Sequence, residues 1–330
     1  MSGIRRRDFV ILLGCGTVAA WPLAARAQQS AMPVVGFMHI QSPKTAPYVV
    51  PFQQGLKEAG FVEGQNVAVE YRWAEGHYDR LPDLVAEFVR RQVAVIAATG
   101  GEPSPQVAKA ATQTIPIVFT SNGDPVREGL VASLNRPGSN ATGVTIFGAA
   151  AVTKRLQLLH ELVPQAAVIG FLMNPNHPNS NIEMQAAQPA ARSLGKEMLV
   201  FNASNERELD AAFAAMAQEK VGALLCGSDT FLMDRRDQIV SLAARYRIPV
   251  MSMVREYVQA GGLIAYGNRV ADMYRLVGIY VGRILKGEKP ADLPVQESTK
   301  FELVINLKTA KALGIEVPNS MQLLADEVIE

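Results

Sequence analysis

The chain has 330 residues, of which 48% are hydrophobic and 19% charged, and its formal net charge is +1. A chain of this length and composition can bury two sizeable cores, which excludes a disordered protein. Acidic and basic residues are balanced and no basic segment follows the N-terminus, so binding to nucleic acid is also excluded.

Residues 1–27 have the pattern of an export signal. Three arginines, Arg5 to Arg7, precede an apolar run over residues 11–23, and Ala25-Arg26-Ala27 provides a small-x-small cleavage site. The Arg6-Arg7-x-Phe9 sequence favours a twin-arginine signal, with an ordinary secretory signal as the alternative. Cleavage would leave 28 basic and 30 acidic residues, a charge of −2. We therefore expect a periplasmic protein that starts near Gln28.

Short apolar runs alternate with amphipathic stretches through the rest of the chain. Expected strands cover residues 34–37, 66–73, 93–98, 115–119, 142–147, 167–173, 197–201, 221–226, 248–253, 263–266 and 301–305. Expected helices cover 51–59, 79–91, 103–111, 126–134, 152–162, 182–194, 206–218, 235–246 and 272–285. No stretch after the signal reaches the roughly 18 apolar residues of a membrane span.

This alternation predicts parallel sheets with right-handed crossovers and helices on both faces. The pattern restarts near residue 152, which indicates two half-size sheets, and the long helix over 272–285 would return the chain to the first half. We expect a first lobe of residues 33–145 plus 268–296 and a second lobe of 146–267 plus 297–330. Because several segments cross between them, the connection is expected to act as a hinge.

Polar and glycine residues follow the carboxyl ends of several expected strands, at positions that we call strand tips. Four tips are 99–101, 121–124, 174–176 and 228–230. Ligands of open α/β sheets bind outside the carboxyl ends of the strands, so these tips predict a ligand crevice. The alternative for each tip is ordinary turn and capping chemistry. Aromatic side chains near the tips, which could stack on a ligand or belong to the core, are Tyr48, Phe119, Tyr257 and Tyr266.

No residue pattern indicates catalysis, a metal or a cofactor. Residues 14–19 match a dinucleotide fingerprint, but they lie inside the signal and follow no strand. The four histidines lack metal-site spacing, and the chain has neither a P-loop nor a G-x-S-x-G elbow. Cys226 is the single cysteine after the signal and is expected in the core, without a disulfide. Cys15 is disfavoured as a lipid-attachment site, because Leu13 is bulky for that motif.

Four sequence blocks resemble the ABC-transporter substrate-binding family that includes the tryptophan- and tyrosine-binding proteins. The blocks are GFVEGQNV at 60–67, IPIVF with DPV at 115–126, RPGSNATG at 136–143 and KFELVINLKTA at 300–310. The resemblance covers the chain from about Pro33 to its end. It implies a type I periplasmic binding protein fold, with two Rossmann-like lobes, three crossovers and a ligand clamped between them.

The resemblance also implies site residues and partners. The family's binding loops map onto His39, Gln41, Ser42, Thr99, Gly100, Gly101, Ser121, Asn122, Asp124, Asn174, Asn176, Ser228, Asp229, Glu256 and Tyr266. The partners would be a small ligand and the permease and ATPase of an ABC importer, with the receptor as a monomer. Some members of the family bind aromatic amino acids.

The leading hypothesis is an exported receptor for a small polar or amino-acid-like ligand. Main-chain N–H groups at Thr99 and Gly100 would bind a ligand carboxylate, Asn122 and Asp124 would position it, and Asp229 would bind an ammonium or hydroxyl donor. An exported α/β enzyme acting on a small amino or aromatic acid is the alternative, although the tips offer only amides, hydroxyls and carboxylates. The sensor domain of a separate kinase is a third hypothesis.

Overall fold

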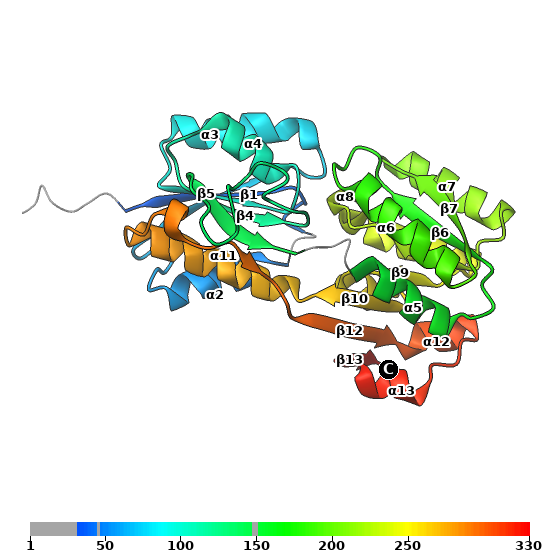
Figure 1. Cartoon of the computed structure of the whole chain (residues 1–330). Coiled ribbons are helices and arrows are strands. Elements are labelled where there is room, and N and C mark those ends of the chain that lie inside the picture. Colours follow the sequence, from blue (N-terminus) through cyan, green and yellow to red (C-terminus); the bar gives the residue numbers. More distant parts are fainter. Residues whose placement is uncertain (1–31, 45–46, 147–150) are drawn as a thin grey trace, which may run out of the picture.

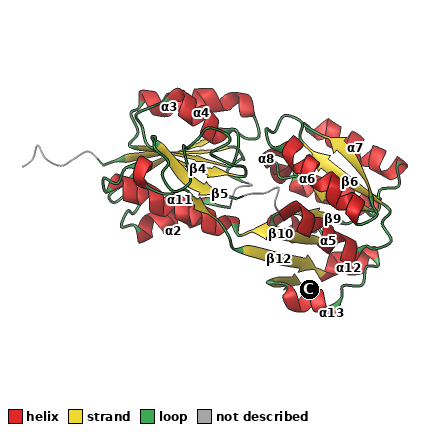
Figure 2. Cartoon of the chain, viewed as in Figure 1, coloured by secondary structure: helices red, strands yellow, loops and turns green. Residues whose placement is uncertain are grey.

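The computed structural model describes residues 32–44, 47–146 and 151–330. The predicted signal and Phe147, the last residue of one expected strand, lie outside these ranges. The described chain forms two lobes, each a sheet with helices on both faces (Figures 1 and 2). The expected alternation of strands and helices is confirmed in both.

The sheet of the first lobe has six strands within the described residues, in the order β11-β5-β4-β3-β1-β2 and all parallel. Its strands are β1 (Val34–His39), β2 (Ala68–Trp73), β3 (Val95–Thr99), β4 (Ile117–Ser121), β5 (Ala141–Thr145) and β11 (Gln296–Glu297). Helices α3 (Leu81–Arg90) and α4 (Ser104–Ala111) cover one face, and α2 (Val49–Glu58) and α11 (Val270–Leu285) cover the other (Figure 1). Two short 3-10 helices are η1 (Tyr78–Arg80) and η3 (Pro290–Asp292).

The second lobe contains a seven-stranded sheet in the order β13-β12-β10-β9-β8-β6-β7. Its strands are β6 (Val168–Met173), β7 (Glu197–Asn202), β8 (Ala223–Cys226), β9 (Val250–Ser252), β10 (Ile264–Asn268), β12 (Phe301–Asn306) and β13 (Glu327–Ile329). Its helices are α5 (Val152–Leu162), α6 (Ser180–Ser193), α7 (Glu206–Gln218), α8 (Thr230–Asp234), α9 (Arg236–Tyr246), α10 (Arg255–Gln259), α12 (Leu307–Leu313) and α13 (Asn319–Leu324).

One pair of strands departs from the expected parallel arrangement. Strand β12 pairs with β10 antiparallel. The chain leaves the second lobe at the end of β10 and enters it again at the start of β12, so the two strands run in opposite directions beside the junction of the lobes (Figure 1). This geometry follows from the return of the chain through α11 and β11.

The helix predicted over residues 126–134 is wrong. The segment makes a single hydrogen-bonded turn, with the Asp124 carboxylate accepting from the N–H groups of Val126 and Arg127. Gly129 then takes a left-handed conformation with φ 71°, which ends the turn. The ammonium of Lys109 binds the carbonyl oxygens of Gly129 and Leu130, groups that a continuing helix would have used itself.

Candidate functional site

A cavity lies at the junction of the two lobes, at the carboxyl ends of strands from both sheets. Its volume is about 40 Å³. The lining residues are His39, Gln41, Tyr48, Gly100, Gly101, Thr120, Asn122, Ile146, Thr230, Met233, Met253, Val254, Val270, Met273 and Tyr274. We call this space the interlobe cavity. No Asp, Glu, Lys or Arg is among these residues, so its wall is apolar, aromatic and neutral polar.

One side of the interlobe cavity is an aromatic wall of His39, Tyr48 and Tyr274. The Tyr48 and Tyr274 rings stack with centroids 4.6 Å apart, and His39 Nε2 lies 2.7 Å from the Tyr274 hydroxyl. Burial lowers the pKa of His39 to about 3, because the charged imidazolium is poorly solvated there. The histidine is therefore neutral at physiological pH, and the wall carries no charge.

Gln41 Nε2, a buried polar atom in the lining of the cavity, has no hydrogen-bond partner among the described residues. The buried Tyr48 hydroxyl lies beside the Glu256 carboxyl. Burial, followed by the charge of nearby Glu256, raises the pKa of the Tyr48 phenol above its usual range, so it keeps its proton. A buried donor without a partner costs free energy, and a ligand could provide the missing acceptor.

Hydrogen bonds between described residues join the two lobes, and one of them connects two residues of the cavity lining. The Tyr78 hydroxyl donates to Asp229 Oδ2 at 2.5 Å, and Thr230 Oγ1 donates to the carbonyl oxygen of Gly100 at 2.7 Å. Asn179 Nδ2 donates to Glu128 Oε1 at 3.2 Å. These contacts hold the two lobes against each other.

Five of the predicted site residues line the interlobe cavity: His39, Gln41, Gly100, Gly101 and Asn122. The N–H groups of Gly100 and Gly101 both donate to Thr120 Oγ1, at 3.1 and 3.2 Å. In this arrangement they are not available to a carboxylate.

The other predicted residues of the first lobe bind within the protein. Thr99 Oγ1 donates to the Met38 carbonyl, Ser121 Oγ donates to Glu102, and Asp124 caps its own turn. The N–H of Ser42 faces Asp234 of the second lobe at 3.5 Å. None of these four residues lines the interlobe cavity.

The predicted residues of the second lobe lie outside the lining as well. Asn174 Nδ2 donates to the Asp229 carboxylate, which also accepts from the Tyr78 hydroxyl and, at the start of α8, from the N–H of Leu232. The carboxylate predicted to bind ligand therefore has three donors within the protein. Asn176 is exposed, with its N–H bound to Asn174.

The remaining three predicted residues have separate surroundings. Ser228 is held by Glu183 through both its N–H and its hydroxyl. Glu256 lines a neighbouring cavity beside the crossing strands. Tyr266 stacks on Phe301 on β12.

The predicted strand tips do not include the part of the lining that α11 provides, nor Met233 of α8. Val270, Met273 and Tyr274 belong to the first turns of α11, directly after β10, whereas Thr230 of α8 lies in the predicted tip 228–230. The α11 residues follow the carboxyl end of β10, so they satisfy the same rule that predicted the other strand tips. No tip was predicted after the strand that ends at Asn268.

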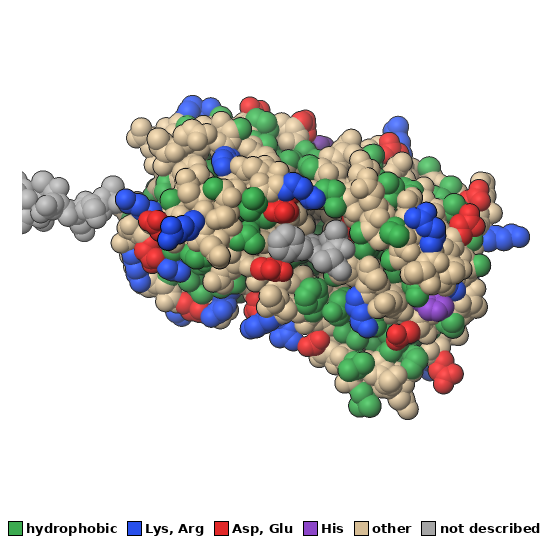
Figure 3. Space-filling model, in the orientation of Figure 1, with side chains coloured by type: hydrophobic (Ala, Val, Ile, Leu, Met, Phe, Trp, Pro, Cys, Tyr) green, Lys and Arg blue, Asp and Glu red, His purple; other side chains and the backbone are tan. Residues whose placement is uncertain are grey.

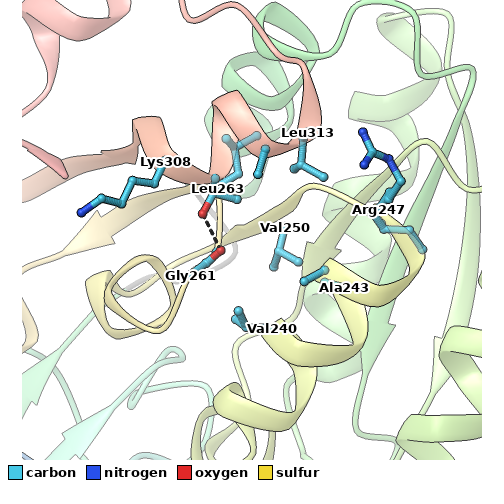
Figure 4. A pocket seen from close by; sticks show the side chains of 13 residues that line it. Val240, Ala243, Arg247, Val250, Gly261, Leu263, Lys308 and Leu313 are labelled. Carbon is cyan, nitrogen blue, oxygen red and sulfur yellow. Dashed lines mark hydrogen bonds between the residues drawn. The ribbon is translucent and has the colours of Figure 1, made fainter. Parts of the chain in front are cut away.

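A larger cavity of about 380 Å³ lies in the second lobe, away from the junction, between α9, α12 and the loop before β10 (Figure 4). Its floor includes Val240, Val250 and Leu263, and Thr309 closes one side by donating to the Gly261 carbonyl. No predicted site residue lines it. Among the described residues, no group of three or more His, Cys, Asp or Glu side chains is placed to hold a metal ion.

The outer surface shows no charged patch of one sign on the face seen in Figure 3, where acidic and basic side chains are interspersed over both lobes. None of the helices within the described ranges is long and apolar enough to cross a membrane.

Residues 9–329 match the family model described as ABC transporter substrate binding protein. The chain belongs to this family. A tyrosine-binding protein from Clostridioides difficile (strain R20291) is 27% identical over 265 residues, which cover 80% of this chain and 76% of that protein. The fold is that of a type I periplasmic binding protein, as the sequence blocks implied.

Two solved structures of relatives differ in how well they match. An ABC domain in complex with L-Trp from Streptococcus pneumoniae gives a TM-score of 0.83 at 25% identity, covering 91% of this chain and all of that one. The ligand-free, open structure of a substrate-binding protein with adhesive properties from Clostridium difficile gives 0.65 at 26% identity, covering 91% and 99%. The structure with L-Trp is thus the better match of these two.

Proposed function

We propose that the protein is the exported receptor of an ABC importer and that it captures an amino acid with an aromatic side chain by closing its two lobes. The observation that carries the proposal is the buried Gln41 Nε2 atom, which has no partner among the described residues, in a cavity that both lobes line. Pockets for small ligands are mostly apolar, with a few polar groups that fix orientation, and this lining has that composition.

The chemistry of the lining favours an aromatic ligand. The rings of Tyr48 and Tyr274 offer a face for stacking, and Met233, Met253 and Met273 add adaptable apolar contacts. The relatives support the same class, since one is named for tyrosine and another was solved with L-Trp.

The polar ends of such a ligand have partners within reach of the cavity. Gln41 and Asn122 line it with neutral amides, which suit a carboxylate. Glu256, beside Tyr48, carries a carboxylate that suits an ammonium group.

Closure of the lobes is part of the proposal because the cavity as it stands is too small. A volume of about 40 Å³ holds a few water molecules rather than an amino acid. The lobes would have to separate for entry and then close around the ligand, moving on the segments where the chain crosses between them. The lobe boundaries predicted from the sequence fall between residues 145 and 146, 267 and 268, and 296 and 297.

The other assignments are the expectations stated from the sequence. We propose export by the signal over residues 1–27, a periplasmic location, a monomer, and delivery of the ligand to a permease with its ATPase. The enzyme alternative would gain support from turnover of an amino or aromatic acid by the purified protein.

A thermal-shift screen against the standard amino acids, aromatic acids and sugars tests the proposal. Ligand at about 100 times its Kd should stabilise the protein by about 2.7 kcal/mol. We expect L-Trp or L-Tyr to raise the Tm. A screen in which sugars alone raise the Tm, or in which nothing does, would refute the aromatic amino-acid proposal.

Two variants test the site itself. Tyr48→Phe and Gln41→Ala each remove one donor to the ligand and should weaken binding by about fivefold to tenfold in calorimetric titration. Lys308→Ala, at the cavity in the second lobe, is the matched control and should bind as the wild type does. Unchanged affinity in both site variants would place the ligand elsewhere.

A further inference from the structure

The larger cavity in the second lobe, which we call the second-lobe cavity, has the size of a separate ligand site. Its volume of about 380 Å³ lies within the range of small-molecule pockets, about 300–1,000 Å³. Its lining comes from α9, β9, α12 and the loop before β10, and it shares no residue with the interlobe cavity. One lobe therefore provides the whole site.

The floor of the second-lobe cavity is apolar. Val240 and Ala243 of α9, Val250 of β9 and Leu263 before β10 line it, and each is at most 7% exposed. Leu313 of α12 adds a further apolar side chain (Figure 4). Covering such a floor with an apolar group removes apolar surface from water, which favours binding.

The walls of the second-lobe cavity are held in place without a ligand. Thr309 Oγ1 donates to the Gly261 carbonyl oxygen at 2.8 Å, and Asn306 Nδ2 donates to the Val258 carbonyl oxygen at 3.1 Å. Gly261 has a φ of 113°, and a Cβ atom there would lie 3.1 Å from Val240 Cγ1. The absence of a side chain at Gly261 thus keeps the space between the loop and α9 open.

Two cations lie at the rim of the second-lobe cavity. Arg247 comes directly after α9 and Lys308 lies in the first turn of α12, at opposite ends of the view in Figure 4. Both side chains are exposed, and neither forms an ion pair with a described carboxylate. No Asp or Glu is among the lining residues. The rim is therefore positive beside an apolar floor.

We propose that the second-lobe cavity binds a small amphiphilic anion, an apolar chain or ring that carries one carboxylate. The apolar body would lie against Val250 and Leu263. The carboxylate would reach the guanidinium of Arg247, whose planar fork of donors matches the two oxygens of a carboxylate. A sugar would leave its hydroxyl groups without partners on this floor, and a cationic ligand would meet like charges.

Calorimetric titration of the full chain with octanoate tests the proposal. The comparison probes are 1-octanol and octyltrimethylammonium, which have the same chain length but a neutral and a positive head group. We expect octanoate to bind at least about fivefold more tightly than either, because only its head group is attracted by Arg247 and Lys308. Equal binding of 1-octanol, or a Kd for octanoate above about 1 mM, would overturn the proposal.

Variants of the lining locate the bound octanoate. Arg247→Gln should weaken octanoate binding by about fivefold. The matched control Arg245→Gln removes the same charge from the end of α9 but from outside the lining, and should bind as the wild type does. Ala312→Phe, at an exposed position of α12 in the lining, should fill the cavity and abolish binding. An unchanged Tm shows that each variant is folded, and unchanged affinity in either lining variant would overturn the proposal.

A second copy of the chain is the alternative occupant of the second-lobe cavity. In that case the protein would sediment as a dimer and would not take up octanoate, which would overturn the proposal. No residue of the interlobe cavity takes part in these experiments, so their outcome and that of the amino-acid screen can be told apart.

Discussion

Arg155 is a fully buried cation, and its partner supports one of the strand tips at the lobe junction. Its guanidinium lies 2.9 Å from Glu183 Oε1, and Glu183 accepts both the N–H and the hydroxyl of Ser228. Arg155 is 1% exposed and Glu183 is 5% exposed, so neither charge is solvated by bulk water. Ser228, which the sequence suggested for ligand binding, is thereby positioned by a carboxylate 45 residues away.

Removing one partner of this pair should destabilise the second lobe strongly. Glu183→Ala leaves the Arg155 charge buried without its carboxylate, and the expected loss in the free energy of unfolding is about 3–5 kcal/mol. Urea unfolding followed by circular dichroism measures it. The control Glu197→Ala, at the exposed start of β7, should change stability by less than about 0.5 kcal/mol. A similar small loss for Glu183→Ala would show that the buried charge is solvated in some other way.

At the scale of elements, the contact between α2 and α11 decides where the long return helix lies. The helices approach through glycines: a Cβ on Gly278 would lie 2.1 Å from the Phe52 carbonyl oxygen, and one on Gly55 would lie 1.9 Å from that of Arg275. Because α11 also carries Tyr274 and Met273 into the cavity lining, this glycine contact sets the position of the aromatic wall.

Gly278→Ala should separate the two helices or strain them. Overpacking of this kind costs about 1–3 kcal/mol, and thermal unfolding should show the loss. Val50→Ala, on the exposed face of α2, is the control and should have little effect. If Gly278→Ala were as stable as the wild type, the backbones would have to lie farther apart than they do in the structure.

At the scale of the whole molecule, a few polar contacts hold the two lobes against each other. The Tyr78 hydroxyl remains a donor to Asp229, because burial and the Asp229 charge raise the pKa of the phenol above its usual range. Asp229 caps α8 in addition, so the contact couples the lobe junction to the start of a helix. For this reason Asp229→Ala would remove the cap of α8 as well as the contact between the lobes. A change at Tyr78 removes the contact alone.

Tyr78→Phe should shift the ligand-free protein toward an open form. It removes one hydrogen bond to a charged acceptor, which is worth about 1.5–3 kcal/mol in favour of the closed form. Small-angle X-ray scattering should show a larger radius of gyration than for the wild type or for Tyr246→Phe, a control on α9. An unchanged scattering curve would indicate that the remaining contacts hold the lobes together without Tyr78.

The sequence by itself determined the order of strands and helices, the parallel sheets and the location of the strand tips. These features depend on hydrophobic periodicity and on turn residues, which act over a few neighbouring positions. The prediction failed locally at residues 126–134, where the Lys109 side chain and Gly129 end the helical turn. The four resemblance blocks also identified the family correctly, as the match over residues 9–329 shows.

Only the tertiary structure decided which polar groups face the cavity and which are bound within the protein. Thr120 Oγ1 accepts from the N–H groups of Gly100 and Gly101, and the Tyr78 hydroxyl donates to the Asp229 carboxylate. The second of these pairs joins residues 151 positions apart, across two lobes. No local pattern encodes such a contact, because it exists only when two separately folded sheets are brought face to face by the chain that crosses between them.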